Sequence, residues 1–149
     1  QTFSSPSGYI ESNKVLMFND RNNKAQAIGE VKIILANKTK IYADNIKADF
    51  TGKAKTLQKA IAKGNVIIEN NDQGKKSKAD LGIYNSSNET IELRGNVVII
   101  NQGSTIIGSQ GITNIKTGTS KITGNPSKRE RVKGMFSPTK KSKKGDKSE

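Results

Sequence analysis

Two carboxylates, Asp44 and Asp80, are the side chains whose type and spacing could support chemistry, because they recur at matching places in a repeated pattern. Two carboxylates within reach of each other could act as general acid and base. A full repeat separates these two, however, and each is alone in its own unit. We therefore predict a structural role for each carboxylate, either capping a turn or pairing with a nearby lysine.

The rest of the composition restricts the chemistry further. The chain of 149 residues contains no histidine and no cysteine, which excludes an imidazole base, a thiol nucleophile and an ordinary zinc site. It also lacks the motifs of phosphate-cradling and calcium-binding loops. We therefore expect a protein that is not an enzyme and that needs neither a cofactor nor a metal. Because Gln1 begins the chain without an apolar leader, we expect a signal peptide that has been removed.

The two carboxylates belong to a repeat whose clearest marks are glycines. Glycines 29, 64, 95 and 124 lie 35, 31 and 29 residues apart, which indicates an internal repeat. In the copy at residues 93–100, Leu-Arg-Gly-Asn-Val-Val-Ile-Ile, alternate residues are apolar or glycine. Period-two alternation is typical of a strand with one buried face. Glycine at an inward position predicts a bend in a curved sheet, or else close approach of a ligand to the backbone.

The same alternation, interrupted by turns rich in Asn, Gly and Ser, predicts eight strands. They are expected at residues 9–18, 24–35, 40–50, 56–69, 77–84, 90–100, 105–115 and 119–124. Such short connections require antiparallel neighbours, so the fold class is all-β, a meander of long antiparallel strands built from repeats of about 30 residues. Beyond each glycine both faces become apolar, which predicts coverage on both sides or an apolar binding surface.

Charge and composition divide the chain into three parts. We expect an N-terminal extension at residues 1–8, a β domain at 9–138 and a basic disordered tail at 139–149. The formal net charge is +13, and residues 128–149 alone carry nine basic and three acidic side chains. A lysine cluster without apolar partners predicts a solvated tail. Contact with phosphate groups, on lipid or nucleic acid, is the alternative.

The order of the motifs resembles a known family. Residues 62–68 read Ala-Lys-Gly-Asn-Val-Ile-Ile, residues 79–84 begin with Ala-Asp and end in tyrosine, and residues 93–99 repeat Gly-Asn-Val. This order resembles the OstA-like family of lipopolysaccharide-transport proteins, over about residues 8–138. Two departures are Asn13 in place of the acid in the first unit, and Gly-Ser in place of Ala-Asp at residues 108–109.

The resemblance implies a twisted, open β-jellyroll in the periplasm, whose apolar interior takes up lipid acyl chains. It also implies end-to-end assembly by edge-strand pairing, which forms a bridge from inner to outer membrane. The implied partners are lipopolysaccharide, inner-membrane and outer-membrane transport components with the same fold, and further copies of this chain as a head-to-tail homo-oligomer.

Strand parity and the resemblance together select candidate site residues. The inward positions expected to bind lipid are Val31, Ile33, Val66, Ile68, Ile91, Leu93, Val97 and Ile99. The positions expected to take part in edge-strand assembly are Ile10, Val15, Met17 and Ile122.

Three alternatives remain open. The chain could be the periplasmic domain of the membrane-anchored partner in the same pathway, and residues before Gln1 would distinguish the two. It could be a purely structural β repeat without a ligand. A basic nucleic-acid binder would need aromatic residues for stacking, and the chain has only three tyrosines and four phenylalanines, so no nucleic acid is expected.

Overall fold

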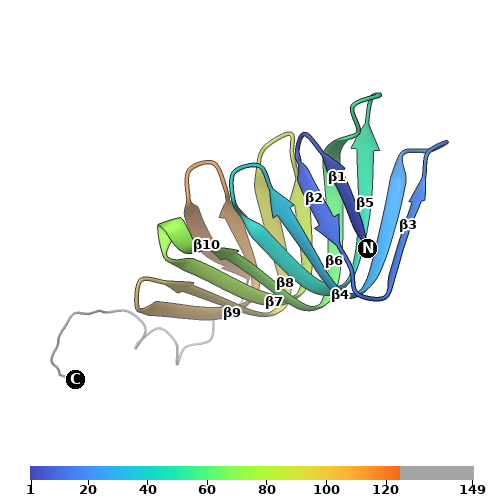
Figure 1. Cartoon of the computed structure of the whole chain (residues 1–149). Coiled ribbons are helices and arrows are strands. Elements are labelled where there is room, and N and C mark those ends of the chain that lie inside the picture. Colours follow the sequence, from blue (N-terminus) through green and yellow to red (C-terminus); the bar gives the residue numbers. More distant parts are fainter. Residues whose placement is uncertain (125–149) are drawn as a thin grey trace, which may run out of the picture.

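The computed structural model describes residues 1–124, which form one antiparallel sheet (Figure 1). The sheet contains ten strands: β1 (Thr2–Ser5), β2 (Gly8–Glu11), β3 (Val15–Asn19), β4 (Lys24–Leu35), β5 (Lys40–Thr51), β6 (Thr56–Asn70), β7 (Lys75–Asn85), β8 (Thr90–Asn101), β9 (Ser104–Asn114) and β10 (Thr119–Gly124). A short 3-10 helix, η1 (Asn71–Gln73), lies between β6 and β7. The prediction of an all-β meander of long antiparallel strands is confirmed. No helix within the described range is long and apolar enough to cross a bilayer.

The long strands bend in the middle, so the sheet folds over on itself into two layers (Figure 1). β4 shows this directly, because its first half pairs with β3 and its second half pairs with β2. Layer 1, as we define it, contains β3, β10, the first halves of β4, β6 and β8, and the facing halves of β5, β7 and β9. Layer 2 contains β1, β2 and the remaining halves.

The bends occur at the repeated glycines. Gly29, Gly64 and Gly95 have φ angles of 88°, 85° and 82°, and the residue after each is also left-handed. The pairing register shifts at each of these places. A glycine in the left-handed region that adds one residue to a strand makes a β-bulge, which bends the strand and strengthens its twist. Of the two explanations for the inward glycines, the bend is therefore the one confirmed.

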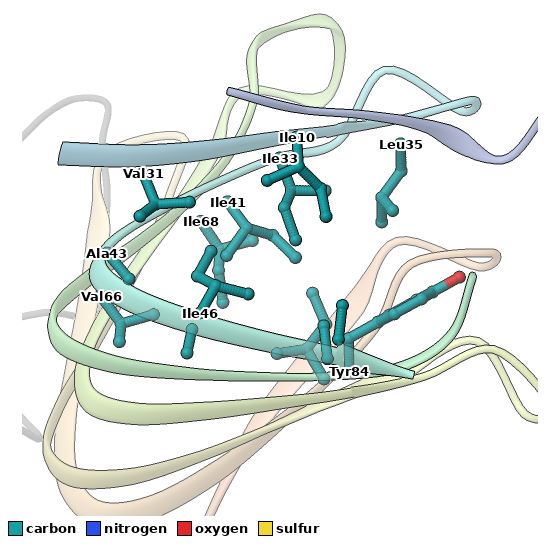
Figure 2. Packing of buried hydrophobic residues seen from close by; sticks show 14 of the residues in the cluster. Ile10, Val31, Ile33, Leu35, Ile41, Ala43, Ile46, Val66, Ile68 and Tyr84 are labelled. Carbon is teal, nitrogen blue, oxygen red and sulfur yellow. The ribbon is translucent and has the colours of Figure 1, made fainter. Parts of the chain in front are cut away.

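Buried apolar side chains fill the space between the two layers (Figure 2). Figure 2 shows Ile33, Ile41 and Ile68 from layer 2 pointing into the interior, toward Ile46 and Tyr84 of layer 1. Inward buried residues alternate with outward, more exposed ones along the long strands, as expected of a half-buried sheet. The core is aliphatic over most of its length.

The N-terminal end differs from the prediction. The strand expected at residues 9–18 is broken by a bend at residues 12–14, so β2 lies in layer 2 and β3 in layer 1. Residues 1–8, expected to precede the domain, contribute β1, which pairs with β2 from Thr2 to Ser5. The buried Ser12 donates a hydrogen bond from its hydroxyl to the carbonyl of Ile28 and thereby holds the bend. The predicted tail at 139–149 lies outside the described residues.

Candidate functional site

The eight inward residues predicted to bind lipid lie together in the core between the layers. Six belong to the second halves of β4, β6 and β8 in layer 2, and the remaining two, Ile91 and Leu93, belong to layer 1. None is more than 5% exposed. They form a continuous aliphatic surface, because Ile33, Ile41 and Ile68 face one another across three neighbouring strands.

Among the described residues, the interior is tightly packed around these side chains. Leu93 and Val97 are 0% exposed, so they contact protein atoms on all sides. A cavity lined by Phe3, Ile33 and Leu35 has a volume of only about 10 Å³, which is at the lower limit for one water molecule. A ligand that reached the eight residues would have to separate the layers and replace contacts that they now make with each other.

The layers approach each other closely over two glycines that the sequence did not mark as inward. Gly82 and Gly111 are the cross-strand neighbours of Leu93 on either side. A Cβ added to Gly82 would lie 3.1 Å from Cγ1 of Val66, and one added to Gly111 would lie 3.2 Å from Cγ1 of Val97. The valines of layer 2 thus rest on bare backbone of layer 1. The parity of β7 changes at its bend, which is why counting along the strand did not mark Gly82 as inward.

An aromatic cluster closes the interior at the end near β1. The ring of Phe3 stacks on Phe18 at a centroid distance of 4.7 Å and meets the edge of Phe50 at 5.1 Å. Nζ of Lys55 lies 5.3 Å from the centroid of Phe18, within range of a cation–π interaction. Phe3 belongs to layer 2, whereas Phe18 and Phe50 belong to layer 1, so the cluster joins the two layers.

The four predicted assembly residues occupy different environments. Val15 and Met17 lie on β3, which pairs only with β4 within the described residues and leaves them 38% and 53% exposed. Ile122 lies on β10, the last described strand of layer 1. Ile10 is not at an edge, because β2 is paired with β1 on one side and with β4 on the other. At that end of layer 2 the edge is β1.

The recurring carboxylates have a structural contact, although with a partner other than lysine. Oδ2 of Asp44 accepts a hydrogen bond of 2.9 Å from the Asn65 amide, and Oδ2 of Asp80 accepts one of 2.8 Å from the Asn96 amide. Each asparagine is the left-handed residue that follows a bulge glycine. The aspartate of each Ala-Asp motif thus accepts a hydrogen bond from the asparagine of the following Gly-Asn motif, on another strand. Within residues 1–124, no group of acidic side chains is arranged to hold a metal ion.

Residues 9–119 match the family model described as LptA/(LptD N-terminal domain) LPS transport protein. The match spans the repeats and nearly all of the sheet. The chain belongs to this family. No curated protein sequence matches the chain.

A solved structure supports the same fold. The chain is similar to LptH of Pseudomonas aeruginosa, described as the LptA homologous periplasmic component of the lipopolysaccharide transport device, with a TM-score of 0.67 and 12% sequence identity. The similarity covers 89% of each chain. The predicted OstA-like resemblance and the twisted open β-jellyroll are therefore confirmed. The family match begins at residue 9, so β1 lies just outside it.

Outside the core, the surface of this family member is basic. Residues 1–124 contain 17 basic and 10 acidic side chains. A hollow of about 830 Å³ on the side of layer 1 near β3 is lined in part by the outward residues Lys47, Lys59 and Ile61. Asp49, which also lines it, is paired with Lys24 at 2.8 Å. Such a hollow leaves no pattern in the sequence, because its shape depends on how the strands twist past one another.

Proposed function

We propose that this chain binds lipopolysaccharide with the acyl chains between its two layers, and carries or bridges it through the periplasm from inner to outer membrane. Lipopolysaccharide transport is the activity of the family, and the protein needs no catalytic step for it. The observation that carries the proposal is the continuous aliphatic interior, which runs from Ile10 at one end of the sheet to Ile122 at the other.

The interior can keep acyl chains out of water during transport. Burying hydrocarbon gives about 0.8 kcal/mol per CH₂, or about 8 kcal/mol for every ten methylenes. The layers already provide an apolar environment, so an acyl chain between them would replace side-chain contacts with similar contacts. The outward lysines of layer 1 and layer 2 can then meet the phosphate groups of the ligand, because charge of opposite sign raises its local concentration.

Assembly would occur at the two ends of the sheet. Among residues 1–124, β3 has one backbone edge without a partner strand in layer 1, and β10 has one at the opposite end of the same layer. Unpaired edges can add a strand from another molecule. Since the two edges differ, pairing of β10 with β3 of the next molecule does not close on itself and would produce rods. Partners with the same fold in the inner and outer membranes would pair at the ends of such a rod.

Native mass spectrometry after co-expression in a host that makes lipopolysaccharide tests the binding step. We expect a bound species whose added mass equals that of lipopolysaccharide. Recovery of the protein without lipid, together with no binding when purified lipopolysaccharide is added, would refute the proposal. A fluorescent fatty acid displaced by lipopolysaccharide would then show whether the ligand occupies the interior.

A further inference from the structure

We propose that the β1–β2 hairpin (residues 2–11, hereafter the clasp) gates the interior, by holding layer 2 against layer 1 at the free ends of the bent strands. This inference rests on the proposed function and adds a regulated entrance to it. Around the clasp the described residues pack tightly, so lipid that enters there must separate the layers locally. At the clasp the two layers are joined by side-chain contacts and not by a strand ladder.

The clasp is firmly attached to layer 2. All four residues of β2 pair with β4, from Gly8 opposite Leu35 to Glu11 opposite Lys32. Gly8 lies so close to β4 that a Cβ at this position would overlap the carbonyl of Ile34. The amide of Ala36 also donates a 2.8 Å hydrogen bond to the carbonyl of Ser7. The clasp therefore moves with layer 2.

Its contacts with layer 1 are few. Phe3 inserts between Phe18 and Phe50, and the hydroxyl oxygen of Ser7 accepts a 3.0 Å hydrogen bond from the amide of Leu57. Phe3 and Ser7 are both only half-buried. No strand ladder joins the clasp to layer 1, whose edge strand β3 pairs only with β4 among the described residues. Release of the clasp would break the two ring contacts of Phe3 and the Ser7–Leu57 hydrogen bond, and would uncover Ile10, which is 3% exposed.

Release would open the part of the interior that the clasp covers. The small cavity beneath it is lined by Ile10, Ile33 and Leu35 from layer 2 and by Phe50 and Leu57 from layer 1. These residues continue directly into the eight predicted to bind lipid, because Ile33 is one of them. The bends hold the layers together on the opposite side, through the continuous backbone of each long strand. Opening at the clasp thus needs only a small change at the bulges.

A reversible disulfide across the gate tests the clasp. The chain has no cysteine, so Ser7→Cys with Leu57→Cys introduces the only pair. The 3.0 Å between the Ser7 hydroxyl and the Leu57 amide keeps the two Cα atoms within about 7 Å of each other, close to the upper end of the separations that a disulfide spans. The reduced form of the same double variant is its matched control, because only the bond differs. The association rate of a fluorescent fatty acid and of lipopolysaccharide is measured in both forms.

We expect the oxidised form to bind at least ten-fold more slowly than the reduced form, with recovery after reduction. Equal rates in the two forms would overturn the clasp while leaving lipid binding intact. If the reduced variant and the parent both fail to bind, the proposed function fails and the gate fails with it.

A second pair of variants does not depend on forming the disulfide. Phe3→Ala removes the aromatic contact, whereas Thr2→Ala changes an exposed neighbour on the same strand. We expect Phe3→Ala to speed fatty-acid association several-fold and Thr2→Ala to leave it unchanged. The same rate in both variants would contradict the gate.

Discussion

The left-handed glycines of the bends allow a quantitative prediction about what holds the sheet in shape. Gly64 has a φ of 85°, and a Cβ built on it would lie 2.7 Å from Oδ2 of Asp44. Gly52 has a similar φ of 74° but has no atom within 4 Å of the same position. The two glycines therefore share the backbone conformation and differ in the contact. Gly64→Ala and Gly52→Ala are a matched pair.

The expected destabilisation follows from two terms. A left-handed residue with a side chain costs about 1–2 kcal/mol, and this term applies to both variants. In Gly64→Ala the new methyl group also displaces the Asp44 carboxylate, and loss of its hydrogen bond to Asn65 adds about 0.5–1.5 kcal/mol. With about 2–4 °C per kcal/mol for a domain of this size, Gly64→Ala should lower the melting temperature by about 5–10 °C. Gly52→Ala should lower it by roughly half as much.

Thermal unfolding followed by far-ultraviolet circular dichroism measures both shifts. Entropy changes of the unfolded chain are the same for each Gly→Ala change, so they cancel in the comparison. In an Asp44→Ala background the difference between the two variants should shrink, since the 2.7 Å contact is then absent. Equal melting temperatures for Gly64→Ala and Gly52→Ala in the parent background would refute the claim that the carboxylate is part of the bend.

Four further predictions concern the ligand, the edges, the tail and pH. Val66→Glu should abolish lipopolysaccharide binding, while Ile67→Glu, its neighbour on the outer face, should retain it; equal binding by a folded Val66→Glu protein would exclude the inner face. Met17→Pro should suppress rod growth in a light-scattering concentration series, because proline removes a backbone donor of β3 and disrupts the edge to which another strand would add, while the other nine strands pair without β3; a parent that is monomeric at every concentration would exclude edge pairing. Deleting residues 139–149 should leave folding and lipid binding unchanged; weaker binding than the parent at low salt, with a smaller difference from the parent at high salt, would instead assign the lysines to phosphate contacts. Burial, with a smaller effect of Glu89, raises the pKa of Tyr84. The folded state should therefore lose stability as the pH rises above about 10, the pKa of tyrosine in the unfolded chain. Tyr84→Phe should reduce that loss in alkaline unfolding.

Most of the sheet could be predicted from local pattern, because a half-buried strand shows its inward face in alternate residues. The alternation in β4 and β8 continues through Gly29 and Gly95 without a change of phase, so the inward residues of these strands were assigned correctly. β7 changes phase at its bend, opposite the bulges of its neighbours. That change hid Gly82, whose inward position depends on pairing between strands.

The N-terminal end could not be predicted, for a different reason. Residues 2–5 are Thr-Phe-Ser-Ser, a stretch too short and too polar to give a period-two signal. What makes it a strand is its pairing with β2 and the contact of Phe3 with two phenylalanines distant in sequence. The break at residues 12–14 also left no signal in the alternating pattern. The buried residue there is the polar Ser12, whose hydroxyl is satisfied by a hydrogen bond to the backbone. Long-range contacts of this kind leave no local pattern.

Beyond each bend glycine the sequence is apolar on both faces, which predicted either a covering layer or an apolar binding surface. The outward apolar residues of layer 2 fit neither prediction fully. No second layer of the described residues covers Ile67 and Val98, yet both are only half-exposed. Lys78 lies between them in the pairing register, opposite Ile67 on β6 and Val98 on β8. A lysine stem can cover neighbouring apolar surface while its ammonium group stays in water. The outer face can thus stay in water while remaining partly apolar. The outward residues are thus accounted for by the lysine stems, and the aliphatic residues that we propose to contact acyl chains are those of the interior, between the bends on one side and the clasp on the other.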